Sequence, residues 1–92
     1  MGYERNVADA KTRERVSSKL AGVLHNLRQE RGLSMTELAA QAGLSRAMIS
    51  HIEHELRNPT VDTLLRIAGV LKVDASEILR RAERAASSSR DG

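Results

Sequence analysis

Apolar residues in this chain recur at steps of three and four positions, which is the period of one face of an α-helix. The first such stripe predicts a helix over residues 16–31 that ends at Gly32, a residue suited to a helix C-terminus. Because no segment alternates as a strand does, we expect an all-α fold of five helices. The other four helices are predicted over residues 34–43, 46–54, 60–71 and 74–86.

Each of these four later helices starts at a residue whose side chain can cap it. Ser34 is followed three positions later by Glu37, a spacing that predicts a reciprocal capping box. Asp74 and Glu77 repeat that spacing at the last helix. Single caps are predicted at two further positions, Ser45 and Thr60.

The apolar face of each helix gives the residues that we expect to be buried. In the first three helices these are Leu20, Val23, Leu24, Leu27, Leu38, Ala39, Ala42, Ile49 and Ile52. In the fourth they are Leu64, Leu65, Ile67, Ala68 and Leu71. The apolar face of the fifth consists of Ile78, Leu79, Ala82 and Ala86, which is more apolar surface than a core of four helices should consume.

The two ends of the chain are poor in apolar residues. Residues 1–15 carry alternating charges and are expected to form a flexible basic arm or a helical extension. Residues 87–92 are polar and predict a disordered tail, so the folded domain is expected over residues 16–86. The basic arm would present four cations, which we expect either to contact phosphate or to be simply solvated: Lys11, Arg13, Arg15 and Lys19.

Composition narrows the class of protein. A chain of 92 residues holds one small domain, and without Cys it has no disulfide and no cysteine zinc site. Tyr3 is the only aromatic residue, which excludes a stacking platform for single-stranded nucleic acid. No apolar run is long enough to span a membrane and the first residues do not resemble a secretory signal, so we expect a cytoplasmic protein.

Charge and candidate chemistry add little by themselves. The net charge of +3 permits a nucleic-acid partner without requiring one, because residues 32–60 are slightly acidic. His51 and His54 are spaced to share a metal, but no Cys or carboxylate pair completes a site. No nucleophile with a base, and no glycine-rich phosphate loop, is apparent. We therefore expect no enzyme activity, no metal and no cofactor.

The second and third predicted helices form the most informative pattern. Only Ala42-Gly43-Leu44-Ser45 joins them, and such a short joint turns the chain sharply, as in a helix-turn-helix motif. Gly43 tolerates the positive φ that this turn requires. Ala39 is small enough for the helices to approach, and Leu44 and Ile49 fill the angle between them.

The stretch 27–79 resembles the lambda-repressor-like helix-turn-helix family, also called the Cro/repressor or xenobiotic-response-element family. The resemblance implies a five-helix DNA-binding domain whose helix-turn-helix is formed by helices 2 and 3. The chain departs from the family pattern at Met35, where Gln is common, and at Glu55, where Gly is common. The segments that carry the resemblance are Arg28, Gly32-Leu33-Ser34, Glu37-Leu38-Ala39, Gly43-Leu44-Ser45, Ile49-Ser50, Ile52-Glu53 and Asn58-Pro59-Thr60.

The resemblance also implies roles for individual residues. The helix over 46–54 would lie in the major groove of double-stranded DNA, while Arg28 and Glu53 would form a structural ion pair that orients it. The expected base-reading residues are Arg46, Ala47, Ser50 and His51. The expected phosphate contacts are Thr36, Ser45, His54, Arg57 and Asn58.

These roles predict a sequence-specific transcription regulator, with repression the expected mode. Because one short helix contacts few base pairs, we expect a homodimer on a pseudo-palindromic operator. The alternative is an antitoxin or co-regulator whose main partner is a protein such as a toxin or RNA polymerase. A free-standing regulator, a restriction-modification controller and a prophage regulator all remain open. The expected dimer interface is Ile78, Leu79, Ala82 and Ala86.

Overall fold

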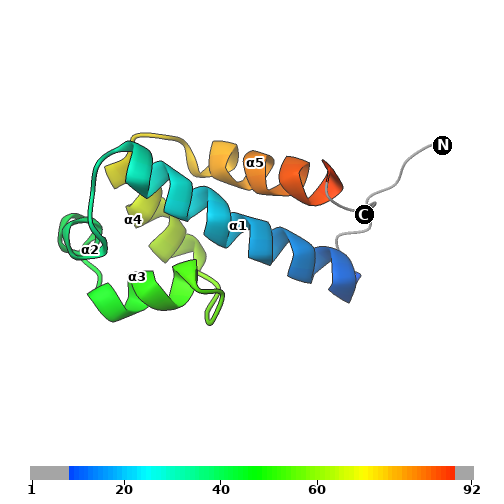
Figure 1. The fold of residues 1–92 in the computed structure, drawn as a ribbon, viewed down its shortest axis with the longest axis horizontal. Coiled ribbons are helices and arrows are strands. Elements are labelled where there is room, and N and C mark those ends of the chain that lie inside the picture. The colour runs from blue at the N-terminus through cyan, green and yellow to red at the C-terminus, as the bar shows by residue number, and fades with distance from the viewer. Residues whose placement is uncertain (1–8, 89–92) are drawn as a thin grey trace.

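A computed structural model describes residues 9–88 of the chain, and this part consists of five helices without a strand. The predicted all-α fold is therefore confirmed. α1 and α5 run antiparallel to one another, with α4 behind them and α2 and α3 to one side (Figure 1). The helices are α1 (Ala10–Glu30), α2 (Met35–Ala42), α3 (Arg46–Glu53), α4 (Val61–Leu71) and α5 (Ala75–Ser88).

The first helix begins six residues earlier than its apolar stripe predicts. Asp9 is the N-cap of α1, and its carboxylate accepts a hydrogen bond from the Thr12 backbone N–H at 3.3 Å. Residues 10–15 of the predicted arm therefore belong to α1, while residues 1–8 lie outside the described residues. At the other end α5 continues through Ser88, and residues 89–92 of the predicted tail also lie outside the described part.

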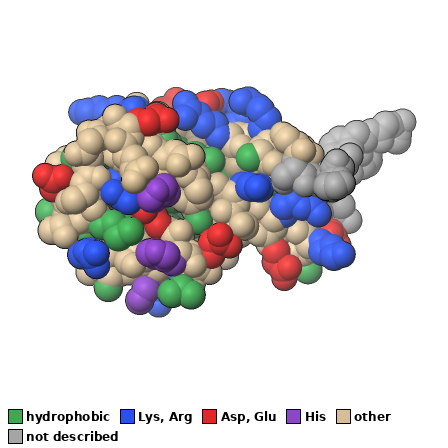
Figure 2. All heavy atoms as spheres, in the orientation of Figure 1, with side chains coloured by type: hydrophobic (Ala, Val, Ile, Leu, Met, Phe, Trp, Pro, Cys, Tyr) green, Lys and Arg blue, Asp and Glu red, His purple; other side chains and the backbone are tan. Residues whose placement is uncertain are grey.

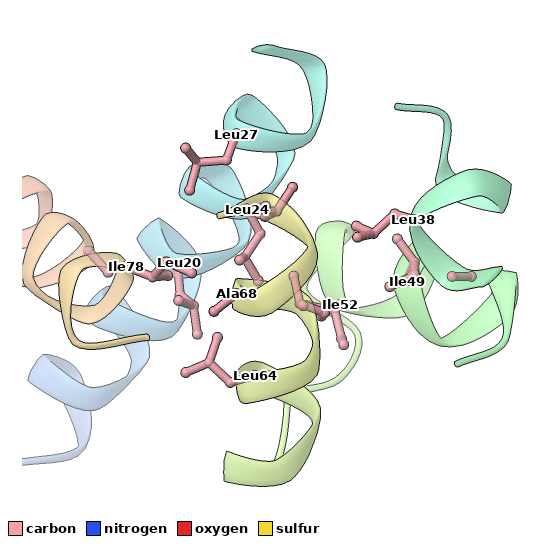
Figure 3. Packing of buried hydrophobic residues seen from close by; sticks show 13 residues of the cluster. Leu20, Leu24, Leu27, Leu38, Ile49, Ile52, Leu64, Ala68 and Ile78 are labelled. Carbon is pink, nitrogen blue, oxygen red and sulfur yellow. The ribbon is translucent and has the colours of Figure 1, made fainter. Parts of the chain in front are cut away.

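One apolar core holds the helices together (Figure 3). Leu24 of α1, Ile67 of α4 and Ile78 of α5 are almost completely buried in it. Leu38 and Ile49 bring α2 and α3 into the same core, so the helix-turn-helix motif is fixed to the rest of the domain. No helix within residues 9–88 combines the length and the apolar character needed to cross a lipid bilayer.

Two expectations about burial are wrong. Leu65 is 56% exposed, because the core side of α4 is occupied by Leu64 and Leu71 and Leu65 lies beyond its edge. Ile78, Ala82 and Ala86, predicted as a dimer surface, are buried within the monomer. They share one face of α5, and that face packs along α1. Of the predicted interface residues, only Leu79 is exposed, at 41%.

The predicted caps of the middle helices are present. Ser34 and Glu37 form the reciprocal box, with N–H to oxygen distances of 3.0 and 2.8 Å. Ser45 and Thr60 accept from the third backbone N–H of their helices at 3.0 and 3.1 Å.

The box predicted at the start of α5 is wrong. There the backbone carbonyl of Asp74 accepts from the N–H groups of Glu77 and Ile78. The Glu77 carboxylate accepts from Arg80 and Arg81 instead of turning back to Asp74. These two arginines lie one turn further along the helix and draw the carboxylate forward.

Candidate nucleic-acid interface

The turn between α2 and α3 fixes the direction of α3. Gly43 adopts the left-handed conformation, with φ at 72°, and the Leu44 N–H donates to the Ala39 carbonyl oxygen at 2.9 Å. Ala39 is buried, so the two helices approach closely at this position. Ile49 and Ile52 then anchor one face of α3 in the core. The opposite face of α3 is left at the surface.

That outer face carries the residues predicted to contact bases. Arg46, Ala47 and His51 are exposed, and Ser50 is half-buried between them and the core. Successive members are one or three positions apart on a single helix, so their side chains share one ridge. Figure 2 shows histidine side chains gathered on the face of the molecule that carries α3.

The hydrogen bonds of His54 limit what its ring can offer. Its Nδ1 lies 2.8 Å from the Ser50 carbonyl oxygen and 3.3 Å from Ser50 Oγ. A ring that donates from Nδ1 to the carbonyl leaves Nε2 directed away from the helix. Because His54 is exposed, this Nε2 faces solvent, where it accepts a hydrogen bond in the neutral ring and donates one to an anion such as phosphate only in the protonated ring.

The residues predicted to contact phosphate surround this ridge. Thr36 is exposed in the first turn of α2, and Arg57 and Asn58 are exposed in the loop between α3 and α4. That loop is tied to α3, because the N–H groups of Leu56 and Arg57 both donate to the His51 carbonyl oxygen, at 2.8 and 3.2 Å. Ser45 is exposed and its oxygen accepts one bond as the cap of α3, so its hydroxyl hydrogen is left to donate to a ligand.

Arg28 and Glu53 form the predicted ion pair beneath the ridge. Arg28 Nε and Nη2 donate to the two Glu53 oxygens at 2.7 and 2.9 Å. Arg28 Nη1 also donates to the Leu33 carbonyl oxygen at 2.9 Å, so the guanidinium is used within the protein. The pair therefore links α1, the α1–α2 loop and the last residue of α3.

Burial and hydrogen bonding act in opposite directions on this carboxylate. Burial raises the pKa of the Glu53 carboxyl, but the hydrogen bonds from Arg28 and His25 outweigh it, so the pKa lies below its ordinary value of 4.5. The hydrogen bond to Glu53 in turn raises the pKa of Arg28 above its ordinary value, against the effect of burial. Both groups are therefore charged at neutral pH.

A family model described as "Helix-turn-helix" (HTH_3) matches residues 24–78, which is more than half of the chain. The chain belongs to the HTH_3 helix-turn-helix family. The match begins within α1 and ends within α5, and it includes the whole of α2, α3 and α4.

Named relatives of this HTH_3 protein are transcriptional regulators. The regulator SutR of Escherichia coli (strain K12) is 41% identical over 66 residues, which are 72% of this chain and 37% of SutR. The immunity repressor protein of Bacillus phage phi105 is 40% identical over 53 residues, 58% of this chain and 37% of the repressor. The chain therefore spans little more than a third of these relatives. Their roles agree with the prediction that the chain is not an enzyme.

Solved structures of the same fold include two that bear on the site. A crystal structure of SinR, the master regulator for biofilm formation, in complex with DNA has a TM-score of 0.63 and 33% identity, covering 65% of this chain and 97% of that one. The wild-type restriction-modification controller protein C.Esp1396I has a TM-score of 0.67 and 32% identity, covering 76% and 95%.

Both departures from the family pattern have a structural consequence in this HTH_3 protein. Glu55 follows α3 in the left-handed conformation, with φ at 64°, where a glycine would be unstrained. Met35 packs against the core at the start of α2 and offers no polar group to a ligand. The first departure places a carboxylate two residues from Arg57, and the second removes a donor from the predicted DNA side.

Sequence reasoning missed His25. Its Nδ1 lies 2.9 Å from Glu53 Oε1, and the ring is half-exposed beside the buried pair. His25 precedes Arg28 by three positions, so both lie on the same face of α1. That spacing was visible in the sequence, but it identifies the role of His25 only when Glu53 is known to meet this face.

Proposed function

We propose that this chain is a sequence-specific regulator of transcription that binds double-stranded DNA and acts as a repressor. The observation that carries the proposal is the outer face of α3, which is exposed along Arg46, Ala47 and His51 while its inner face is locked in the core. A helix held in this way can enter the major groove without disturbing the fold. SinR, a structural relative, has been crystallised with DNA.

Each base contact has a chemical basis. Arg46 can donate two hydrogen bonds to guanine O6 and N7, and Ala47 can contact a thymine methyl group. Ser50 and His51 can each donate or accept at a base edge. The glycine turn and the Arg28–Glu53 pair hold these groups in place from both ends of α3.

Phosphate contacts would position α3 in the groove. We assign them to residues on either side of the ridge: Thr36, Ser45, His54, Arg57 and Asn58. A second copy of the chain would supply a second α3, so that two half-sites about one helical turn apart form a pseudo-palindromic operator.

The test is selection of bound sites from random duplex DNA at a stated salt concentration, followed by affinity measurements on the selected site. Arg46→Ala and His51→Ala should each weaken binding to that site about 5- to 100-fold, the range for loss of a good base contact. Binding to unrelated DNA should change much less, because the phosphate contacts are kept.

Arg84→Ala is the matched control. It removes the same charge from an exposed position on α5, away from the ridge, and should leave both affinities nearly unchanged. Circular dichroism would check that the α3 variants are folded. If folded variants bind the selected site as tightly as the wild-type chain does, then α3 does not recognise its bases.

A further inference from the structure

Two large apolar side chains lie uncovered on one face of α4. Val61 is 76% exposed and Leu65 is 56% exposed, and their spacing of four residues places them one turn apart on the same face. Within the described residues the other exposed large hydrophobic side chains are Leu56 and Leu79, which lie on other elements. We call the pair Val61 and Leu65 the α4 stripe.

Charges of opposite sign run beside the α4 stripe. Asp62 and Arg66 follow Val61 and Leu65 by one residue each, so they flank the stripe along the same edge of the helix. Arg66 Nε donates to Asp62 Oδ2 at 2.8 Å, and the Arg66 side chain is about half exposed while that of Asp62 is largely exposed. Arg66 Nη1 also donates to the Ala42 carbonyl oxygen at 3.3 Å, which holds the guanidinium near the end of α2.

This arrangement is complementary to itself in one orientation. If two copies pack α4 against α4 in antiparallel fashion about a twofold axis, each Asp62 lies opposite the Arg66 of the other copy. The same rotation places the α4 stripes against each other. A parallel pairing would instead bring like charges together, which is unfavourable.

From these observations we propose that the α4 stripe, with Asp62 and Arg66 at its edge, is the contact surface for a second copy of this chain. The inference rests on the proposed function in one respect, since an operator with two half-sites needs two copies. It replaces the predicted interface on α5, most of which is buried in the monomer. The exposed apolar area is small, so association in the absence of DNA is weak and depends on concentration.

Sedimentation equilibrium of the full chain without DNA tests the proposal, because it does not depend on any operator. Leu65→Lys should weaken self-association at least tenfold. Leu56→Lys is the matched control, since Leu56 is 73% exposed but lies in the loop before α4, and it should leave association unchanged. A wild-type chain that stays monomeric at every concentration, or a Leu56→Lys effect as large as that of Leu65→Lys, overturns the proposal.

A charge exchange between two variants tests the pairing itself. Asp62→Arg and Arg66→Asp should each abolish self-association, because each variant then presents charges of one sign. An equimolar mixture should associate again, since the two variants are complementary to each other but not to themselves. A mixture that stays monomeric overturns the antiparallel pairing.

Measuring DNA binding by Leu65→Lys distinguishes a failure of this inference from a failure of the proposed function. Leu65→Lys leaves α3 intact, so the variant should still bind a single half-site with the specificity of the wild-type chain while losing the added affinity of the full operator. A chain that dimerises through the α4 stripe but selects no DNA sequence would contradict only the proposed function.

Discussion

The guanidinium of Arg28 and the carboxylate of Glu53 are joined by two hydrogen bonds of 2.7 and 2.9 Å, although 25 residues separate them in the chain. Both side chains are less than a tenth exposed. Since Glu53 is the last residue of α3, this pair fixes the end of the helix that the glycine turn does not hold. The angle of α3 relative to α1 therefore depends on two charged side chains as well as on apolar packing.

Removal of Glu53 should be severely destabilising. In Glu53→Ala the buried Arg28 loses its counter-charge, and breaking one partner of a buried pair costs about 3–5 kcal/mol. The free energy of unfolding in urea measures this loss. Asp62→Ala is the control, because it breaks the exposed Asp62–Arg66 pair and should cost less than about 1 kcal/mol. Similar losses for the two variants would contradict the role assigned to burial.

The same carboxylate should make stability depend on pH in the acid range. Because the pKa of Glu53 is lowered by folding, its contribution is complete above its ordinary value of 4.5 and is lost as the pH falls through the lowered value. Glu53→Gln should therefore unfold with a flatter dependence on pH below about 4.5. Thermal unfolding between pH 3 and 7 measures the difference, and parallel curves for the variant and the wild-type chain would refute it.

Two glycines should respond to alanine in opposite directions. Gly43→Ala places a side chain at a φ of 72° with its Cβ 2.9 Å from Arg66 Nη1, and it should destabilise the fold by about 1–2 kcal/mol. Gly69→Ala adds a methyl group within α4 where nothing lies within 4 Å, and should stabilise it by about 0.5–1 kcal/mol. Urea denaturation of both variants checks the signs, and a stabilising Gly43→Ala would show that the turn does not require glycine.

Glu55→Gly should improve both stability and the proposed DNA affinity. Glycine relieves the left-handed backbone at φ 64°, a gain of up to about 1 kcal/mol, and removes a negative charge two residues from Arg57. Lys72→Gly is the control, since Lys72 has a φ of 63° at the end of α4. Lys72→Gly should raise the melting temperature without raising the affinity for DNA. If Glu55→Gly instead weakens DNA binding, then Glu55 itself contacts the DNA.

Features encoded by a few neighbouring residues were predicted well. The starts of α2, α3 and α4 depend on the local caps Ser34, Ser45 and Thr60, and the turn depends on Gly43. Leu65 shows the limit of periodicity, because Leu64 and Leu65 are adjacent and only the packing of α4 decides which of them faces the core. The reading face and the phosphate contacts remain predictions for DNA-binding experiments.

Other features depend on partners that are distant in sequence. The exposure of α5 was misjudged because Ile78, Ala82 and Ala86 are covered by α1, which a pattern within α5 does not indicate. His25 was overlooked for the same reason, since its carboxylate partner is 28 residues away. The early start of α1 depends on the cap at Asp9, a single residue in a segment otherwise poor in apolar side chains.

The packing of α5 along α1 joins the first helix of the described chain to the last (Figure 1). Until α5 is in place, the face of α1 that α5 covers is exposed to water, so partial structures gain little from the remaining helices. Folding should consequently be an all-or-none event, with the closure of this long loop as its slow step. A chain shortened before Ala75 is expected to remain loosely collapsed and to be degraded readily by proteases.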